Sequence, residues 1–395
     1  MATIRYMTND DLLSYKRLSS ICYTYADAEE PKQCSEDELH QRVGVFDDDG
    51  TLFSAMIHHR FTARFEGHDV ALVGIGGVVT DPVARGQGYV RKLFEKYLPV
   101  LYDEGYVFSA LYPFSHAFYR KFGYELVFEQ RRVELTCGSL REDLSRADEI
   151  VRVLPDQDDQ GMRQIYERYI ADKHFAIKRT DRMWRDLREG TPWEKMKYAY
   201  VLKRKGESIA YWIGSASKED SNAVLTPDDF AYTCREGCEA IFSMLRGMNE
   251  IGRLNLYLPA ELDPRWLVKD PYDVSFKGIN CGGMMRVINV EKVLGLLQAP
   301  PIDGKLTIQV TDQQIPGNNG NFTVEGDGGA LRIIRDAGRP VELRCTVNGL
   351  SALIGGLQSF DDALLAGHGT LLTDECHRFA AMLFPKRKTH LNWGF

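Results

Sequence analysis

The sequence of 395 residues has no long uninterrupted run of apolar side chains. A helix that spans a bilayer needs about 18 or more such residues in succession. The first residues, from Met1 to Tyr6, also lack the charged stretch and the apolar segment that are typical of a secretory signal peptide. We therefore expect no membrane span, no secretory leader and a cytoplasmic location.

Paired cysteines and an excess of basic charge are also missing. The eight cysteines are scattered, and Cys234 and Cys238 form the only close pair. No further cysteine or histidine accompanies this pair at zinc-ligand spacing, so we expect reduced thiols and no bound metal. The net charge of -7 leaves no basic stripe for nucleic-acid phosphates, so we expect no nucleic-acid partner. Low-complexity segments and short internal repeats are absent as well.

What the sequence does contain is the composition of an ordinary folded protein. Hydrophobic residues make up 44% of the chain and charged residues 27%. A chain of this length exceeds one typical domain, and roughly two to three domains are expected.

One segment combines a strand, a glycine-rich turn and the start of a helix. The run Val73–Val79 is rich in β-branched residues and predicts a buried strand. Gly86 and Gly88 follow, and apolar residues at helical spacing predict a helix over 90–101. Free N–H groups at a helix start bind anions, the helix dipole favours negative charge, and Arg85 adds a guanidinium. The segment therefore predicts a binding site for a pyrophosphate.

This turn differs from the common nucleotide-binding motifs. The Rossmann fingerprint needs a third glycine where this chain has Arg91, and the Walker motif needs a Gly-Lys-Ser/Thr that does not follow. The segment instead resembles the acetyl-CoA motif of the GNAT superfamily of N-acetyltransferases, which reads Arg/Gln-x-x-Gly-x-Gly/Ala. Arg85, Gly88 and Val90 fall on its three specified positions, with Val90 in place of a small residue. A glycine turn that only packs a helix on a sheet is the alternative.

A second segment supports the same resemblance. Phe108–Leu111 predicts a short strand, and the sequence from Phe118 to Tyr124 then resembles the GNAT pattern Phe-Tyr-x-x-x-Gly-Phe/Tyr. In that superfamily the tyrosine of this short helix lies near the thioester sulfur. The resemblance implies that Tyr119 is the general acid that protonates the leaving thiolate. Phe118, Phe122 and Tyr124 are expected in the core.

The predicted elements divide the chain into three parts. Residues 1–150 form the first domain and contain the glycine-rich turn. Residues 151–290 repeat a similar order of strands and helices without such a turn, so we interpret them as a degenerate second copy. Residues 291–395 predict strands followed by helices. The expected fold class is α/β (α+β), with two tandem GNAT-like domains, the second degenerate, and a final α+β domain.

This three-part order resembles the enhanced intracellular survival (Eis) family of bacterial aminoglycoside N-acetyltransferases over essentially the whole chain. The resemblance implies a sterol-carrier-protein-like third domain and a homo-oligomer, a hexamer built as a trimer of dimers. In that family the C-terminal carboxylate of a final phenylalanine is the general base, which implies this role for Phe395. A hydrophobic tail that plugs a groove is the alternative for this residue. Some relatives have an arginine cluster where this chain has Gly86 and Gln87, so phosphate contacts here should rely more on backbone groups.

The implied co-substrate is acetyl-CoA, and no metal is implied. The coenzyme-binding residues are expected on the strand end, the turn, the helix start and the loop before Tyr119: Val78, Val79, Thr80, Arg85, Gly86, Gln87, Gly88, Tyr89, Val90, Arg91, Phe114 and Ser115. The expected acceptor is a small, polycationic amine such as an aminoglycoside. Acidic clusters at Asp27–Glu30, Glu36–Glu38 and Asp47–Asp49 could attract it. A solvated acidic surface explains these clusters equally well.

Other functions stay open at this point. Protein lysines or polyamines are alternative acceptors. A lipid- or ligand-binding protein with a relict acetyltransferase domain is the alternative outside enzymes, although the intact turn at Arg85 argues against it. No cysteine is placed as the sequence motifs would place an acyl-enzyme nucleophile, so we expect direct transfer in a ternary complex.

Overall fold

The computed structural model describes residues 2–27, 29–219 and 222–395. The chain has a mixed α/β fold, as predicted, and divides into two compact units. The first unit comprises Met1–Val127, Gly283–Arg387 and Leu391–Phe395, and the second comprises Phe128–Gly282 and Lys388–His390. Among the described residues, no helix has the length and apolar character needed to cross a bilayer.

The N-terminal part of the first unit is a sheet in the order β1-β2-β3-β4-β5, continued by the end of β12. Its strands are β1 (Thr3–Tyr6), β2 (Arg42–Phe46), β3 (Leu52–Phe65), β4 (His68–Thr80), β5 (Phe108–Leu111) and β12 (Ser275–Val287). Only β4 and β5 pair in parallel, and this pairing stops at Ile75 opposite Leu111. The last residues of β4 therefore run on without β5 beside them.

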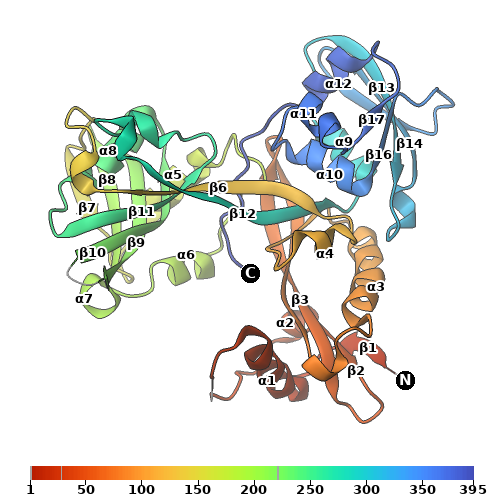
Figure 1. The fold of residues 1–395 in the computed structure, drawn as a ribbon, viewed down its shortest axis with the longest axis horizontal. Helices are drawn as coiled ribbons and strands as arrows, with labels where there is room; N and C mark the ends of the chain where they lie inside the picture. The colour runs from red at the N-terminus through yellow and green to blue at the C-terminus, as the bar shows by residue number, and fades with distance from the viewer. Residues whose placement is uncertain (1, 28, 220–221) are drawn as a thin grey trace. The chain divides into compact units, whose positions relative to one another are not determined.

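Helices cover both faces of this sheet. They are α1 (Leu12–Tyr23), α2 (Glu36–Leu39), α3 (Tyr89–Asp103) and α4 (His116–Arg120). Phe94 of α3 belongs to one apolar cluster with Met56 of β3, and Leu18 of α1 belongs to another with Ala55. Because neighbouring residues of a strand point to opposite faces, α1 and α3 pack on opposite sides of β3. Figure 1 shows the two helices on either side of these strands.

The C-terminal part of the first unit has its own five-stranded sheet in the order β15-β14-β13-β16-β17, in cyan and blue in Figure 1. Its strands are β13 (Asp303–Thr311), β14 (Gly320–Asp327), β15 (Leu331–Arg335), β16 (Leu343–Thr346) and β17 (Thr370–Leu371). Its helices are α9 (Val290–Leu296), α10 (Val347–Gly355), α11 (Phe360–Leu365) and α12 (His377–Leu383). The α+β composition predicted for this region is confirmed.

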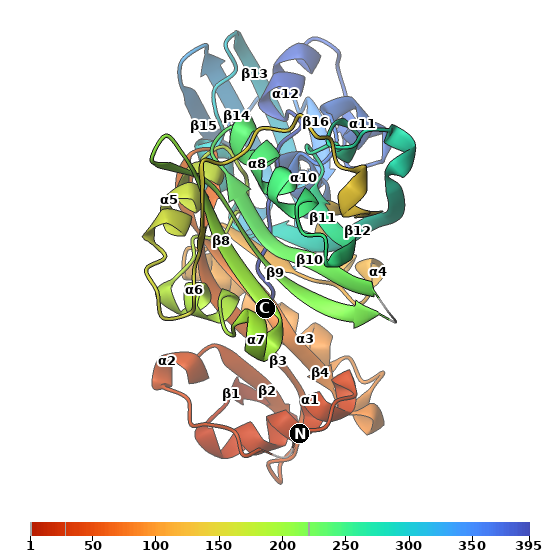
Figure 2. The same ribbon diagram turned by 90° about the vertical axis from the view of Figure 1, so that its left-hand side faces the viewer.

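The second unit is a sheet in the order β7-β8-β9-β10-β11-β6 with helices on both faces (Figure 2). Its strands are β6 (Glu125–Leu135), β7 (Glu149–Arg152), β8 (Lys197–Arg204), β9 (Glu207–Glu219), β10 (Asn222–Tyr232) and β11 (Ile251–Pro259). Its helices are α5 (Gln160–Tyr169), α6 (Asp181–Leu187), α7 (Pro192–Lys195) and α8 (Arg235–Arg246). Phe242 of α8 clusters with Trp212, and Tyr166 of α5 clusters with the preceding Tyr211, so these helices lie on opposite faces.

The two sheets share one topology. In the first unit β4 leads through α3 to the parallel strand β5, and in the second unit β10 leads through α8 to the parallel strand β11. Only Thr233 and Cys234 separate β10 from α8, so this connection has no glycine turn, as expected for a degenerate copy.

The compact units and the predicted domains have different borders. Residues 130–135 of β6 pair with β11 inside the second unit, and residues 284–287 of β12 pair with β5 inside the first. The borders of the compact units fall within β6 and β12, and the domain borders at 150 and 290 stay a prediction.

Candidate active site

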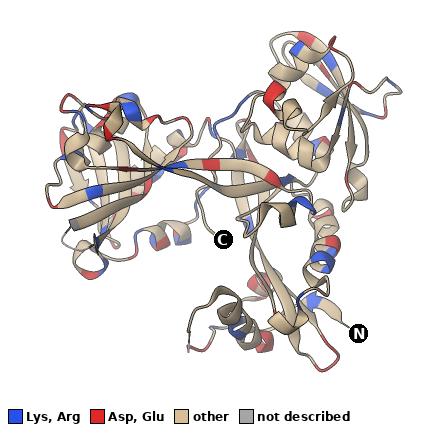
Figure 3. Ribbon diagram, in the orientation of Figure 1, with Lys and Arg blue, Asp and Glu red and all other residues tan. Residues whose placement is uncertain are grey.

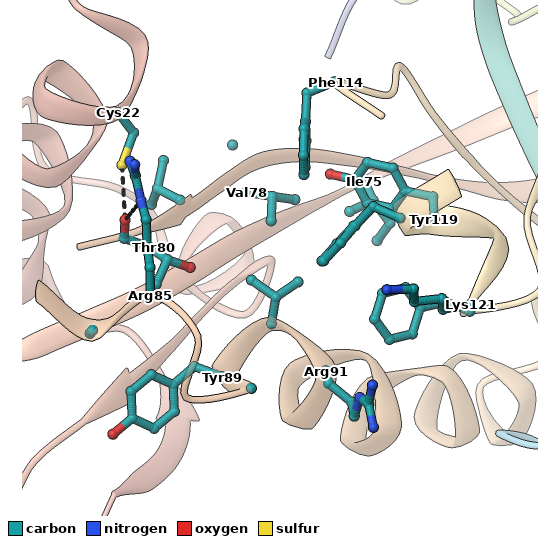
Figure 4. Close-up of a pocket in the computed structure, with 18 of the residues that line it drawn as sticks. Cys22, Ile75, Val78, Thr80, Arg85, Tyr89, Arg91, Phe114, Tyr119 and Lys121 are labelled. Atoms are coloured by element: carbon teal, nitrogen blue, oxygen red, sulfur yellow. Dashed lines mark hydrogen bonds between the residues drawn. The ribbon is translucent and has the colours of Figure 1, made fainter. Parts of the chain in front are cut away.

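A cavity of about 960 Å³ lies in the first unit where β4 runs on beyond β5 (Figure 4). The end of β4, the glycine-rich turn, the start of α3 and the region of α4 form its walls. Its lining residues are Cys22, Tyr23, Ile75, Gly76, Gly77, Val78, Val79, Thr80, Ala84, Arg85, Gly86, Gly88, Tyr89, Val90, Arg91, Tyr112, Phe114, Phe118, Tyr119, Lys121, Phe122 and Phe395.

The glycine-rich turn has a backbone conformation that explains its glycines. Gly86 and Gly88 have φ angles of 81° and 75°, which side-chain-bearing residues rarely adopt. The space around both residues is open, so conformation and not crowding requires glycine here. Gly88 is the N-cap of α3, and no side chain caps this helix end. The first N–H groups of α3 therefore lack helical partners and, together with the helix dipole, favour an anion.

The charged side chains on the cavity wall are all cationic. Arg85, Arg91 and Lys121 line it, and Figure 4 shows them spread around the opening. The Arg85 Nε donates to the backbone oxygen of Thr80 at 3.4 Å, which ties the guanidinium to the end of β4. No Asp or Glu side chain of the described residues lines the cavity. The site therefore suits a ligand with several negative charges.

The strand β4 carries a bulge in the cavity wall. Its register with β3 shifts between Ala55 and Ile57, so one residue of β3 lies opposite both Gly77 and Val78. Gly77 has a φ of 55°, which explains glycine at this position. A bulge takes backbone groups out of the hydrogen-bond ladder. Such groups are available to polarise a carbonyl group bound beside them.

Four tyrosines line the cavity, and one of them differs in its hydrogen bonds. Three hydroxyls donate to protein oxygen atoms: Tyr23 to Val78 at 3.4 Å, Tyr89 to Gln87 at 2.9 Å and Tyr112 to Leu391 at 2.9 Å. The Tyr119 hydroxyl has no hydrogen-bond partner among the described residues, although the side chain is only 3% exposed. Burial, together with Tyr23 and Tyr124, raises the pKa of Tyr119. Tyr119 is therefore a protonated phenol whose donor is unused.

Tyr124, the other phenol of the second motif, is a core residue. It is fully buried, and its hydroxyl shares a hydrogen bond of 2.6 Å with Ser109. It does not line the cavity. Phe118 and Phe122, which we also expected in the core, do reach the cavity wall. Phe122 stacks on Phe94 in the core cluster, and Phe118 packs against that cluster.

The last residue of the sequence, Phe395, packs against β4. Its ring lies 5.4 Å from that of Phe61 and 5.3 Å from that of Tyr112, between centroids. A Cβ on Gly74 would come within 2.7 Å of the Phe395 ring. A Cβ on Gly76 would come within 2.5 Å of the Phe395 carboxyl carbon. The close approach of Phe395 therefore requires glycine at both positions of the strand.

The cavity brings together the predicted site residues with two exceptions. Gln87 accepts the hydrogen bond of Tyr89 and does not line the wall. Ser115 accepts from the N–H of Phe118 at 3.4 Å and so caps α4. Lining residues that the sequence motifs did not indicate are Cys22, Tyr23, Ile75, Gly76, Gly77, Ala84, Tyr112, Phe118, Lys121 and Phe122. The pair of glycines inside a strand pattern is a signal of a bulge that could have pointed to Gly76 and Gly77.

The three acidic clusters do not line this cavity. Figure 3 shows acidic and basic residues interspersed along the chain. Carboxylates of the clusters contact neighbouring residues. Two form ion pairs, Asp27 with Lys16 at 2.8 Å and Asp37 with Arg60 at 2.7 Å. Glu38 completes a capping box with Ser35, and Asp47 accepts a hydrogen bond from the N–H of Thr51 at 2.7 Å. These contacts favour the solvated-surface interpretation, and a role in attracting a cationic acceptor stays a prediction.

One cysteine lies on the cavity wall. Cys22, at the end of α1, donates through Sγ to the backbone oxygen of Thr80 at 3.4 Å. The sequence motifs did not indicate this placement, because α1 is distant in sequence from the glycine-rich turn. No described His, Lys or carboxylate hydrogen-bonds to this sulfur as an activating base would.

Two regions of the sequence match known families. Residues 3–127 match the family described as an acetyltransferase (GNAT) domain, and residues 290–392 match the family described as a sterol carrier protein domain. Among curated proteins, none matches this chain. The glycine-rich turn, the bulge and Tyr119 all lie within the first match.

Solved structures share the fold of the whole chain. They include a GCN5-related N-acetyltransferase from Anabaena variabilis, with 17% identity and a TM-score of 0.88. A probable N-acyltransferase from Enterococcus faecalis has 19% identity and a TM-score of 0.81, and Eis1 from Mycobacterium abscessus has 18% and 0.82. Each alignment covers 100% of both chains. At the level of fold, the resemblance to Eis that the sequence motifs indicated is confirmed.

Proposed function

We propose that the protein transfers the acetyl group of acetyl-CoA to an amine. Its residues 3–127 match the GNAT acetyltransferase domain, which supports this activity. The transfer is direct, within a ternary complex of enzyme, acetyl-CoA and acceptor. The observation that carries this proposal is one cavity lined by an anion-binding turn, by the unpartnered hydroxyl of Tyr119 and by Phe395.

The turn holds the pyrophosphate of the coenzyme. The N–H groups at the start of α3 and the guanidinium of Arg85 face the phosphates, and Arg91 and Lys121 add positive charge. Gly88 lets the backbone take the conformation that starts the helix at this point. The pantetheine then follows the free edge of β4 toward the bulge, where a backbone N–H of Gly77 or Val78 polarises the thioester carbonyl.

Two proton transfers complete the reaction. The amine nitrogen attacks the thioester carbon, the new C–N bond forms, and the C–S bond breaks to release the CoA thiolate. The α-carboxylate of Phe395 takes the proton of the attacking amine, and the hydroxyl of Tyr119 gives its proton to the sulfur. Two features support these roles: the carboxyl carbon of Phe395 lies against Gly76, next to the bulge, and the Tyr119 hydroxyl has no acceptor in the part of the chain that the structure describes.

The acceptor is proposed to be a small cationic amine, with an aminoglycoside as the first compound to test. Polyamines and protein lysines present the same nucleophile and remain the alternatives. A lipid-binding protein with a relict acetyltransferase domain fits the sterol carrier protein match at 290–392, but it does not explain the open anion-binding turn and the free phenol. We further propose that the protein acts in the cytoplasm as a homo-oligomer, by analogy with the Eis family.

Release of free CoA thiol tests the proposal. The purified protein is incubated with acetyl-CoA, with and without an amine from a panel of aminoglycosides, polyamines and lysine peptides. We expect thiol release that depends on at least one amine and a product that carries the acetyl group. Thiol release that is equal with and without every amine would contradict acetyl transfer to amines.

A further inference from the structure

The chain after α12 is anchored within the first unit before it reaches the cavity. The guanidinium of Arg387 forms an ion pair of 2.6 Å with the carboxylate of Glu66, and both side chains are buried. Glu66 lies in the turn between β3 and β4, where its φ is 49°. A buried ion pair whose partner is removed is strongly destabilising, so this contact fixes the path of the chain at Arg387.

A second anchor lies inside the cavity wall. Tyr112 follows Leu111, the last residue of β5, and its hydroxyl donates to the backbone oxygen of Leu391 at 2.9 Å. Desolvation raises the pKa of Tyr112, so the phenol keeps its proton and remains a donor. Leu391 is 1% exposed, so this hydrogen bond is shielded from water. Only three residues lie between Leu391 and Phe395, and this short segment limits the positions that Phe395 can reach.

The third contact is a site on β4, formed by Gly74 and Gly76, which we call the seat of Phe395. The glycines at 74 and 76 leave space that the ring and the carboxyl group of Phe395 occupy. The ring of Tyr112 also contacts the Phe395 ring, with 5.3 Å between centroids. Tyr112 therefore touches the C-terminal segment twice, through its hydroxyl and through its ring.

We propose that Tyr112 is a positioning residue, which holds segment 391–395 so that the Phe395 carboxylate stays on the seat formed by Gly74 and Gly76. This inference rests on the proposed function, in which that carboxylate takes the proton of the amine. It also separates two phenols of the same cavity: the hydroxyl of Tyr112 is committed to Leu391, whereas the hydroxyl of Tyr119 is available to the leaving thiolate.

Two variants test this role by kinetics. Tyr112→Phe removes the hydrogen bond and keeps the ring, and Gly76→Ala places a Cβ where the carboxyl carbon lies. We expect Tyr112→Phe to lower kcat by about five- to tenfold, the effect of one lost hydrogen bond, and Gly76→Ala to lower it further. The affinity for acetyl-CoA should stay within about twofold. Gly295→Ala in α9, with one neighbour at 4.0 Å from the added carbon, is the matched control.

The pH profile distinguishes positioning from a general loss of structure. With the carboxylate displaced, only amine that is already neutral reacts, so the activity of Tyr112→Phe should recover as the pH rises toward the pKa of the amine. A variant that is only less well folded would lose the same fraction of activity at every pH. Wild-type kcat and a wild-type pH profile in Tyr112→Phe would overturn the proposal.

Carboxypeptidase digestion provides a readout that needs no acetyltransferase activity. We expect release of Phe395 to be faster from folded Tyr112→Phe and Gly76→Ala than from wild type and Gly295→Ala. Equal release rates in all four proteins would overturn the positioning role. If wild type acetylates no amine but Tyr112→Phe loses Phe395 faster, the positioning role stands and the proposed function fails.

Discussion

Tyr119 differs from the other tyrosines of the cavity in what its hydroxyl contacts. A buried hydroxyl usually has a partner, because an unsatisfied polar group away from water costs free energy. The hydroxyls of Tyr23, Tyr89 and Tyr112 each donate to a protein oxygen atom, whereas that of Tyr119 lies at the cavity with no partner among the described residues. A phenol with a raised pKa and an unused donor is suited to give a proton to a group that arrives with the substrate.

The prediction for Tyr119 follows from this geometry. Tyr119→Phe should lower kcat by roughly 10²- to 10⁴-fold, the usual contribution of a positioned proton donor, because the ring packing stays and only the donor is lost. Affinity for acetyl-CoA, measured by calorimetry, should be nearly unchanged. Tyr124→Phe serves as the comparison, since Tyr124 is buried outside the cavity. A strong loss of turnover in Tyr124→Phe with full activity in Tyr119→Phe would show that Tyr119 is not the general acid.

His58 gives a prediction about pH and stability. The side chain is 2% exposed, and burial, followed by Arg60 and His59, lowers the pKa of His58 from 6.5 to about 4. The unfolded chain therefore binds a proton below pH 6.5 that the folded protein rejects, so stability falls as the pH drops from 6.5 toward 4. The loss from this residue reaches at most about 1.4 kcal/mol per pH unit.

Thermal unfolding at pH 7 and pH 5 measures this effect. We expect the Tm of wild type to fall between the two values and the Tm of a folded His58→Gln variant to fall less. Equal changes in Tm for the two proteins would show that His58 is not the group responsible.

At the scale of elements, the glycine-rich turn and α3 form the structure expected to bind the coenzyme. Gly88→Asp should abolish acetyl-CoA binding, because a carboxylate at the helix start repels the pyrophosphate and the φ of 75° disfavours a side chain. Arg85→Ala should weaken binding by about 1.5–3 kcal/mol, as expected for a hydrogen bond to a charged group. Calorimetry on folded variants measures both changes. Unchanged affinity of Gly88→Asp for acetyl-CoA would show that the pyrophosphate does not bind at this turn.

Elements with a strong local pattern could be predicted from the sequence. The strand expected over 73–79 is part of β4, and β5 has the predicted bounds. The helix expected over 90–101 is α3, which begins one residue earlier, at Tyr89, and ends two residues later, at Asp103. The strands are short, largely apolar runs and the helix has apolar residues at helical spacing, and local sequence is sufficient to reveal both patterns.

The strand β10 shows why other elements could not be predicted. It contains Pro227, which cannot donate to the ladder, and its register with β9 shifts between Pro227 and Asp229. Asp229 is buried and forms an ion pair of 2.7 Å with Arg179, which is 50 residues away in sequence. The burial of a charged residue in this strand depends on that distant partner, so no local sequence pattern predicts this strand.

The seat for Phe395 is a similar case. The glycines at 74 and 76 fit a strand that ends near a turn, and nothing in their neighbourhood indicates a contact with a residue more than 300 positions later. The resemblance to the Eis family implied that Phe395 belongs to the active site. The contact with Gly74 and Gly76, and the role of Tyr112, required the folded structure.

At the scale of the whole molecule, the resemblance to the Eis family that the sequence motifs indicated leads to a prediction about assembly. Closed symmetric oligomers are common among soluble enzymes, and the family resemblance implies a hexamer. Light scattering at micromolar concentration should therefore give a mass several times the 44.9 kDa of one chain. A mass of one chain across the concentration range would contradict the oligomer.

The proposed mechanism depends on a base that the C-terminal residue provides, and turnover of a C-terminally extended protein tests this most directly. A short peptide added after Phe395 converts the carboxylate into an amide, while the turn at Arg85 is unchanged. Phe395→Leu, which keeps the carboxylate and trims the ring, is the matched comparison. The account predicts that the extension lowers kcat for amine acetylation by at least about 10²-fold with wild-type affinity for acetyl-CoA, and that Phe395→Leu keeps most activity. Full activity in the extended protein would contradict it.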